Sequence, residues 1–173
     1  MKSMLHLKFI ALYIIFGFLC LFTTATLTTQ LVENRLMEDT SETLYREATL
    51  IASDYLPSYF TDDSSLYAVQ SQLAAMRLYL DASLWFVDST GTMITSSNIE
   101  NTSAPEAIEE FNPAEIGGSQ YISGTYHGYF KEDVITVMAP VTQSFYTKGY
   151  LLIHSPVASV EQRCASIMHP VYI

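Results

Sequence analysis

The chain has 173 residues, of which 49% are apolar and 15% are charged, and its formal net charge is −10. This length allows one folded domain together with an additional segment. The chain has 18 acidic residues and only 8 basic ones, so its surface is unsuited to nucleic acid, whose binding depends on neutralising phosphates.

The first predicted element is a helix rich in apolar residues. No charged residue occurs from Phe9 to Val32, and a membrane-spanning helix needs about 20 predominantly apolar residues. We therefore expect a transmembrane helix over residues 9–30. The basic bias of the preceding residues places 1–8 in the cytoplasm and the remaining chain outside it. A cleaved signal peptide is the alternative, and it also exports the remainder of the chain.

Two further helices are predicted before the first strand. Apolar residues recur at helical spacing over residues 31–55, and Pro57 ends that helix because it disfavours helical geometry in Leu56. The second helix follows the polar residues 61–65, which can cap its exposed amides. One of its faces carries Leu66, Val69, Leu73, Met76 and Leu80, which we interpret as core residues.

The pattern then changes to that of strands. Residues 84–97, LWFVDSTGTMITSS, predict a β-hairpin with Gly91 in its turn. A polar connection over 99–120 follows, with a short helix predicted near residues 105–111.

Three more strands are predicted, over residues 121–130, 133–141 and 149–155. A final amphipathic helix is expected after Pro156, with its apolar stripe continuing to Val171. The fold class is therefore α+β. We expect a five-stranded antiparallel sheet with the long N-terminal helix, the second helix and the C-terminal helix on one face, which leaves the other face for a pocket or partner.

Several of these segments carry a resemblance to a known family. The segments are LYREATLIASDY (44–55), LWFVDSTGTMI (84–94), EDVITVMAPV (132–141) and GYLLIHSPVASVEQ (149–162). Together, in this order of elements, they resemble the extracytoplasmic sensor region of bacterial two-component histidine kinases, which is PAS-like and of the kind called single Cache or PDC.

The resemblance implies a sensor domain over residues 31–165 and the start of a truncated membrane-returning segment over 166–173. Such kinases continue into a second membrane helix, a linker, a phosphorylated histidine and an ATP-binding domain, and this sequence contains none of these parts. We interpret the chain as a sensor fragment or a truncated gene product, whose parent the resemblance implies to be a histidine kinase.

The sequence holds no motif of a common catalytic site. It lacks the metalloprotease pattern H-E-x-x-H, a glycine-rich phosphate loop ending in Lys, and the G-x-S-x-G elbow of hydrolases. We therefore predict no catalytic residue, no metal and no cofactor in this chain.

The candidate ligand-binding residues are mostly aromatic, because a ring with a polar tip can hold and orient a small ligand. Arg77 is included because it can meet a carboxylate, although a pair with Asp81 one helical turn away is an equal alternative. His154 is interpreted instead as a half-buried histidine satisfied by hydrogen bonds. The full set of candidates is Arg77, Trp85, Tyr121, Tyr126, His127 and Tyr129.

These observations predict a membrane-anchored extracytoplasmic input domain of a histidine kinase that passes a signal through its terminal helices. The expected partners are an unknown small ligand or peptide, the membrane and a second copy in a homodimer, and no nucleic acid. A cytoplasmic response regulator is reached only through the missing kinase portion. The alternatives are the input domain of a chemoreceptor and an exported structural or interaction protein without a ligand.

Overall fold

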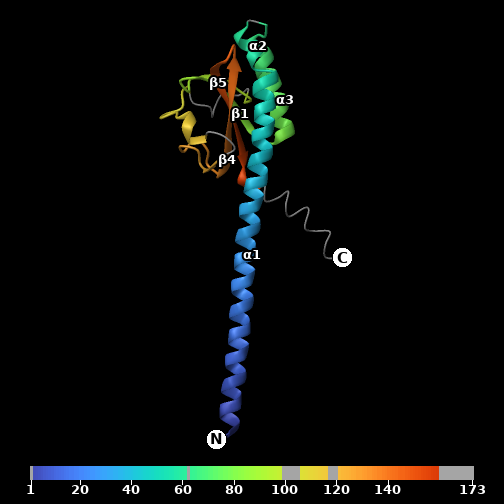
Figure 1. Cartoon of the computed structure of the whole chain (residues 1–173), viewed down its shortest axis with the longest axis vertical. Coiled ribbons are helices and arrows are strands. Elements are labelled where there is room, and N and C mark those ends of the chain that lie inside the picture. Colours follow the sequence, from blue (N-terminus) through green and yellow to red (C-terminus); the bar gives the residue numbers. More distant parts are fainter. Residues whose placement is uncertain (1, 62, 99–105, 117–120, 160–173) are drawn as a thin grey trace. The chain divides into compact units, whose positions relative to one another are not determined.

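The computed structural model describes residues 2–61, 63–98, 106–116 and 121–159 (Figure 1). The chain divides into two compact units, residues 1–38 and residues 39–173. Helix α1 (Lys2–Asp54) belongs to both, and each unit is described by itself below.

The first unit consists of helix α1 up to residue 38. Its described apolar side chains up to Val32 are exposed, with Phe16 at 63% and Phe22 at 73% of their accessible surface, whereas Leu36 and Met37 are partly buried. The hydroxyl groups of Thr23, Thr24 and Thr26 donate to main-chain carbonyls one turn earlier in the helix. Among the described residues, no helix combines the length and the apolar character needed to cross a membrane.

The second unit begins with the end of α1, followed by α2 (Pro57–Phe60) and α3 (Leu66–Leu80). Pro57 stands at the first position of α2, where a missing N–H costs no hydrogen bond. The Ser65 side chain caps α3 by accepting a hydrogen bond from the Ala68 amide at 3.2 Å. Asp81 closes α3 in the left-handed conformation, with φ of 51°. The predicted second helix is thus confirmed, with Val69, Leu73 and Leu80 buried beneath it; α2 was not predicted.

Five strands form one antiparallel sheet, as the sequence predicted, and the structure shows their order to be β2-β1-β5-β4-β3. The hairpin pairs β1 with β2, and β5 lies at the centre between β1 and β4. The central position explains why consecutive β5 residues from Leu151 to Ser155 are all buried. The strands are β1 (Ser83–Asp88), β2 (Met93–Ser96), β3 (Ile122–Gly124), β4 (Val134–Gln143) and β5 (Tyr146–Pro156).

Side chains alternate between two differently covered faces of this sheet. On one face Phe86 contacts the rings of Tyr59 and Phe60 of α2, edge to face with centroids 5.8 Å apart in both pairs. On the other face Trp85 and Leu152 belong to a second cluster, which is covered by side chains from the segments 106–116 and 121–130. Figure 1 shows the helices of this unit on one side of the sheet and the yellow-green segments on the other. We call these the helix face and the loop face.

Three predicted elements differ from the structure. The strand predicted over 121–130 ends at Gly124, because Tyr126, His127 and Gly128 have φ of 41°, 53° and 78°, which no strand permits. The short helix predicted near 105–111 is wrong: a 3-10 helix, η1 (Pro113–Ile116), follows instead. The connection between β4 and β5 is shorter than predicted, since both strands extend to a two-residue turn at Ser144 and Phe145.

The predicted C-terminal helix begins as expected after Pro156, because residues 157–159 are helical. Its remainder, including Cys164 and Val171, lies outside the described residues.

Candidate functional site

The centre of the loop face is His154, on the central strand β5. It pairs in register with Ser83 of β1 on one side and with Thr136 of β4 on the other. Its side chain is buried, with 1% of its surface accessible. The Nδ1 atom shares a hydrogen bond of 2.8 Å with the Thr136 hydroxyl, whereas Nε2 has no hydrogen-bond partner in the described part of the chain. A buried polar atom without a partner is uncommon and often marks a functional position.

Aromatic rings surround the imidazole of His154. Ring centroids lie 4.4 Å away for Trp85, 4.8 Å for Tyr126 and 4.8 Å for Phe130. Trp85 also stacks on Phe130 at 5.4 Å and meets Tyr129 edge to face at 5.8 Å. These five residues, His154, Trp85, Tyr126, Tyr129 and Phe130, are called the aromatic cluster below.

Burial keeps the aromatic cluster uncharged. It lowers the pKa of His154 from 6.5 to about 3, because no neighbouring group compensates the lost hydration of an imidazolium. Burial also raises the pKa of Tyr126, and the nearby carboxylate of Glu115 acts in the same direction. The imidazole and the phenol are therefore both neutral at physiological pH, and they offer polar atoms without formal charge.

A tight turn brings three of the rings to the sheet. After Gly124 the chain folds back, with the Phe130 amide donating to the Thr125 carbonyl and the Tyr129 amide to the Tyr126 carbonyl, both at 3.1 Å. Tyr126 and His127 adopt left-handed conformations, which are strained for residues with bulky side chains. Such strain persists only where the surrounding packing holds it, and the contact of Tyr126 with Trp85 and His154 supplies that packing.

The segment before η1 is fastened over the same face. The Met93 amide donates to the Glu106 carbonyl at 2.9 Å, and the Ile108 amide donates to the Gly91 carbonyl at 3.0 Å. The Tyr129 hydroxyl accepts a hydrogen bond from the Glu109 amide at 3.1 Å and so joins this segment to the turn. Two short segments, 106–111 and 125–130, therefore cover the loop face, and we call them the cover of the loop face.

The hairpin turn beside this cover is fixed by one carboxylate. Asp88 Oδ1 accepts hydrogen bonds from the Thr90 amide at 2.8 Å, the Thr90 hydroxyl at 2.6 Å and the Thr92 amide at 2.9 Å. Desolvation alone would raise the pKa of Asp88, but these hydrogen bonds outweigh it and the pKa is lowered. Asp88 is thus a structural residue of the turn.

A groove of about 450 Å³ adjoins the aromatic cluster. Tyr129 and Phe130 belong to both, and Ser83 of the groove is the register partner of His154. The groove also contains one basic and one acidic side chain, Lys131 and Glu132. Its lining residues are Ser83, Asn98, Tyr129, Phe130, Lys131, Glu132, Val134 and Pro156.

The structure brings four of the six predicted site residues together. Trp85, Tyr126 and Tyr129 are in the aromatic cluster, and the ring of His127 packs on Tyr126 with centroids 5.0 Å apart. Arg77 is exposed on α3, which packs on the helix face, and its carbonyl accepts from the Asp81 amide.

Tyr121 is half-buried just before β3, and no described contact joins it to the cluster. Sequence reasoning missed Phe130 and treated His154 as satisfied. Alternation along β5 did place His154 on the same face as Leu152. The burial of its second nitrogen depends on rings that come from the distant segment 126–130.

The aromatic cluster and its groove form a site suited to binding. The rings offer apolar faces, and the buried Nε2 atom of His154 offers one hydrogen bond in surroundings of low polarity, where such a bond is strong. This combination resembles small-molecule sites in general, which are mainly apolar with a few placed polar groups.

No protein-family model matches the sequence, and no curated protein matches it. Solved structures do share the fold. One is the sensor domain of the histidine kinase DctB from V. cholerae, with a TM-score of 0.56 and 18% identity, covering 80% of this chain and 59% of that chain. Another is the sensory domain of the Campylobacter jejuni chemoreceptor Tlp3 (CcmL), with a TM-score of 0.50 and 17% identity, covering 80% of this chain and 63% of that one.

At these identities the likeness concerns the fold alone. The chain spans about three fifths of the length of either structure. The predicted resemblance to a sensor domain is confirmed at that level, and it extends to sensor domains of a histidine kinase and of a chemoreceptor alike.

Proposed function

We propose that this chain is the extracytoplasmic input domain of a two-component histidine kinase, and that it binds a small ligand on the loop face. The observation that carries the proposal is the unpartnered Nε2 atom of His154, buried among aromatic rings beside a groove. The fold supports it, since sensor domains share this architecture. A ligand with an apolar body and one hydrogen-bonding group fits these surroundings.

The position of His154 on β5 gives ligand binding a short route to the end of the domain. Pro156 ends β5 and residues 157–159 turn into a helix, whose start is held by a hydrogen bond of 2.9 Å from the Val157 amide to the Asp133 carbonyl. A ligand shifts an equilibrium only if it binds two arrangements with different affinities. A ligand group that forms a hydrogen bond with His154 and displaces the rings over it changes the structure only three residues before that helix.

The partners follow from this role. We propose a homodimer formed through the first helix, contact with a membrane, and a response regulator reached through a kinase portion that follows this domain. The likeness to the sensory domain of a chemoreceptor makes the input domain of a chemoreceptor the second candidate. Both candidates require a ligand, whereas an exported structural protein does not.

Ligand binding is tested with the purified chain and a panel of amino acids, carboxylates, amines, nucleobases and short peptides. The melting temperature is followed with each compound for the wild type and for His154→Gln. We expect at least one class to raise the melting temperature of the wild type, and His154→Gln to reduce that shift. If no class stabilises the wild type, or if His154→Gln responds equally, the loop face is not the ligand site.

A further inference from the structure

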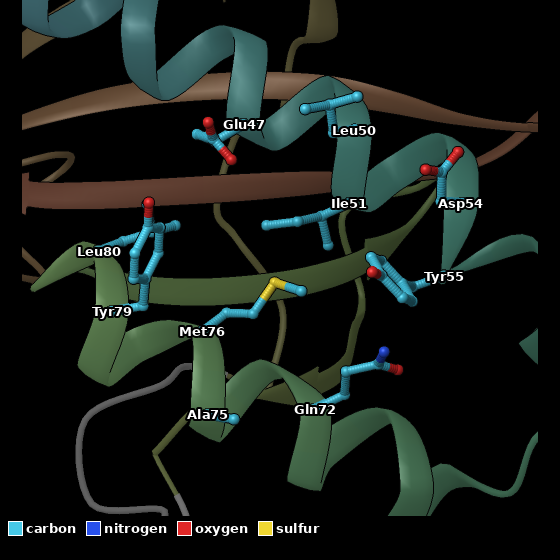
Figure 2. A pocket seen from close by; sticks show the side chains of 10 residues that line it. All are labelled: Glu47, Leu50, Ile51, Asp54, Tyr55, Gln72, Ala75, Met76, Tyr79 and Leu80. Atoms are coloured by element: carbon cyan, nitrogen blue, oxygen red, sulfur yellow. The ribbon is translucent and has the colours of Figure 1, made fainter.

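A second groove lies on the helix face, between the end of α1 and α3, far in sequence from the aromatic cluster. It consists of two adjoining hollows of about 440 and 450 Å³ that share Glu47, Tyr79 and Leu80. Figure 2 shows Ile51 from α1 and Met76 from α3 reaching into the space between the helices.

The floor of this groove is apolar and its rims are wide open. Ile51 and Leu80 are buried, whereas Leu50 has 49% and Tyr79 has 81% of its surface exposed. Ala75 lies on the outer rim of the groove, on the side of α3 away from α1, and is exposed, so its small side chain leaves that rim low (Figure 2). Two helices with such a gap between them present the surface that a third helix covers in helix-in-groove recognition.

All formal charges along the groove are negative. Asp39, Glu47 and Asp54 line it, and none of the described lining residues is basic. The basic residues of these two helix segments, Arg46 on α1 and Arg77 on α3, are exposed outside it. A partner that covers the apolar floor therefore places its flanking residues against carboxylates.

The carboxylates along the groove are spaced for an extended partner and are too far apart for one metal ion. At about 1.5 Å per residue, Asp39 lies about 12 Å from Glu47 along the helix axis, and Glu47 lies about 10 Å from Asp54. One cation cannot contact carboxylates so far apart, and no group of metal-ligating side chains is found among the described residues. Basic side chains two turns apart on a helix match this spacing.

A second copy of the chain fits the groove less well than a basic partner. Its net charge is also −10, and symmetric pairing through the groove brings Glu47 and Asp54 toward carboxylates of the same kind. The exposed stripe of α1 with Glu42 and Arg46 carries both signs, so the homodimer proposed above can use that stripe and leave the groove open.

We propose that the groove between α1 and α3 binds a cationic amphipathic helix of a partner peptide or protein. The apolar face of that helix covers Ile51, Met76 and Leu80, and its Lys or Arg side chains meet Glu47 and Asp54. Residues 39–54 span about 22 Å, which accommodates a helix of about 15 residues. This inference goes beyond the proposed ligand site, because it involves the opposite face of the sheet and does not require a small ligand.

The test uses the full chain and a labelled synthetic helix of about 15 residues, with Leu at every third or fourth position and Lys on the flanks. Its comparison peptides are a scrambled sequence of the same composition and one with Glu in place of Lys. Fluorescence anisotropy measures the dissociation constants at low and high salt. We expect saturable binding of the amphipathic cationic peptide alone, and weaker binding at high salt because exposed charges are screened.

Matched variants locate the binding. Glu47→Gln with Asp54→Asn is expected to weaken binding about three- to tenfold, as the loss of two exposed charge pairs predicts. Glu109→Gln with Glu110→Gln changes the net charge equally on the loop side and is expected to leave affinity unchanged. Ala75→Trp places a bulky ring on the low α3 rim of the groove and is expected to weaken binding by on the order of tenfold, since a bulky group there obstructs the partner helix.

Several outcomes overturn the proposal. One is an absence of saturable peptide binding, and another is an equal loss of affinity in the two double variants that each remove two charges. A third is tighter binding of a peptide of residues 160–173 than of the synthetic helix, which would assign the groove to the chain's own C-terminal segment. Dimerisation that Ala75→Trp abolishes in sedimentation velocity would assign it to a second copy. His154→Gln is expected to lose the ligand response and to keep its affinity for the peptide. Failure of the proposed ligand site is therefore distinguishable from failure of the proposed peptide groove.

Discussion

The buried imidazole of His154 makes the stability of the domain depend on pH. Its pKa is about 3 in the folded chain and 6.5 when it is exposed. Below pH 6.5 the imidazole binds a proton in the unfolded chain but stays neutral in the folded chain, so the free energy of unfolding decreases until the pH approaches 3. Above pH 7 this group does not change the free energy of unfolding. With these two values, His154 alone lowers the free energy of unfolding by about 2–3 kcal/mol between pH 7 and pH 4.5.

Urea unfolding at several pH values measures this loss. The fluorescence of Trp85 reports the transition, because it is the only tryptophan of the chain and its ring lies 4.4 Å from the His154 ring. His154→Gln keeps a polar side chain but cannot titrate, so we expect its stability to fall less steeply with pH over this range. The relevant comparison is the slope, because the substitution also changes the hydrogen bond with Thr136 and hence the stability at every pH.

His127→Gln provides the matched control, since it removes an exposed imidazole whose ring packs on Tyr126 of the aromatic cluster. Its slope shows how far the removal of an imidazole that is not buried changes the pH dependence. Parallel curves for the wild type and His154→Gln would refute the reasoning, because they would mean that the buried ring is accessible to protons or that it titrates as in the unfolded chain.

Three further predictions concern the cover of the loop face. Gly91→Ala should lower the free energy of unfolding by about 1–3 kcal/mol in urea titrations, because Gly91 has φ of 89° and an added Cβ would lie 2.5 Å from Phe111; an unchanged midpoint contradicts this. Asp88→Ala should cost about 1–2 kcal/mol through the loss of its turn hydrogen bonds, whereas wild-type stability after Asp88→Ala would show that the turn forms without them. Tyr129→Phe should cost about 1 kcal/mol and speed amide exchange at Glu109, and unaltered exchange there would contradict the role of its hydroxyl.

The sequence predicted those parts of the fold that depend on local pattern. Alternation and turn residues placed the hairpin around Gly91, and the continuous apolar run of residues 151–153 is what a central strand requires. The cap at Ser65 and the proline after Leu56 set the ends of helices correctly. Each of these signals lies within a few residues of the feature it produces.

The candidate site was predicted only in part, because its geometry depends on contacts between distant segments. Tyr126 and His127 fit a strand pattern, yet they adopt left-handed conformations that only packing against Trp85 and His154 can hold. No local pattern reports such a turn. The groove between α1 and α3 was missed for the same reason, because its lining comes from two helices whose individual patterns indicate only core packing.

The two proposed sites lie on opposite faces of one sheet, and strand β5 contributes to both sides of it. His154 belongs to the aromatic cluster, while its neighbour Ile153 is buried on the other face, in register with Leu84 of β1. Close packing transmits small displacements, since a core without voids cannot absorb them locally. A ligand that moves His154 must therefore also shift the packing of Ile153 beneath the helices. This arrangement favours signalling through displacement of β5, because neighbouring residues of one strand cannot move independently.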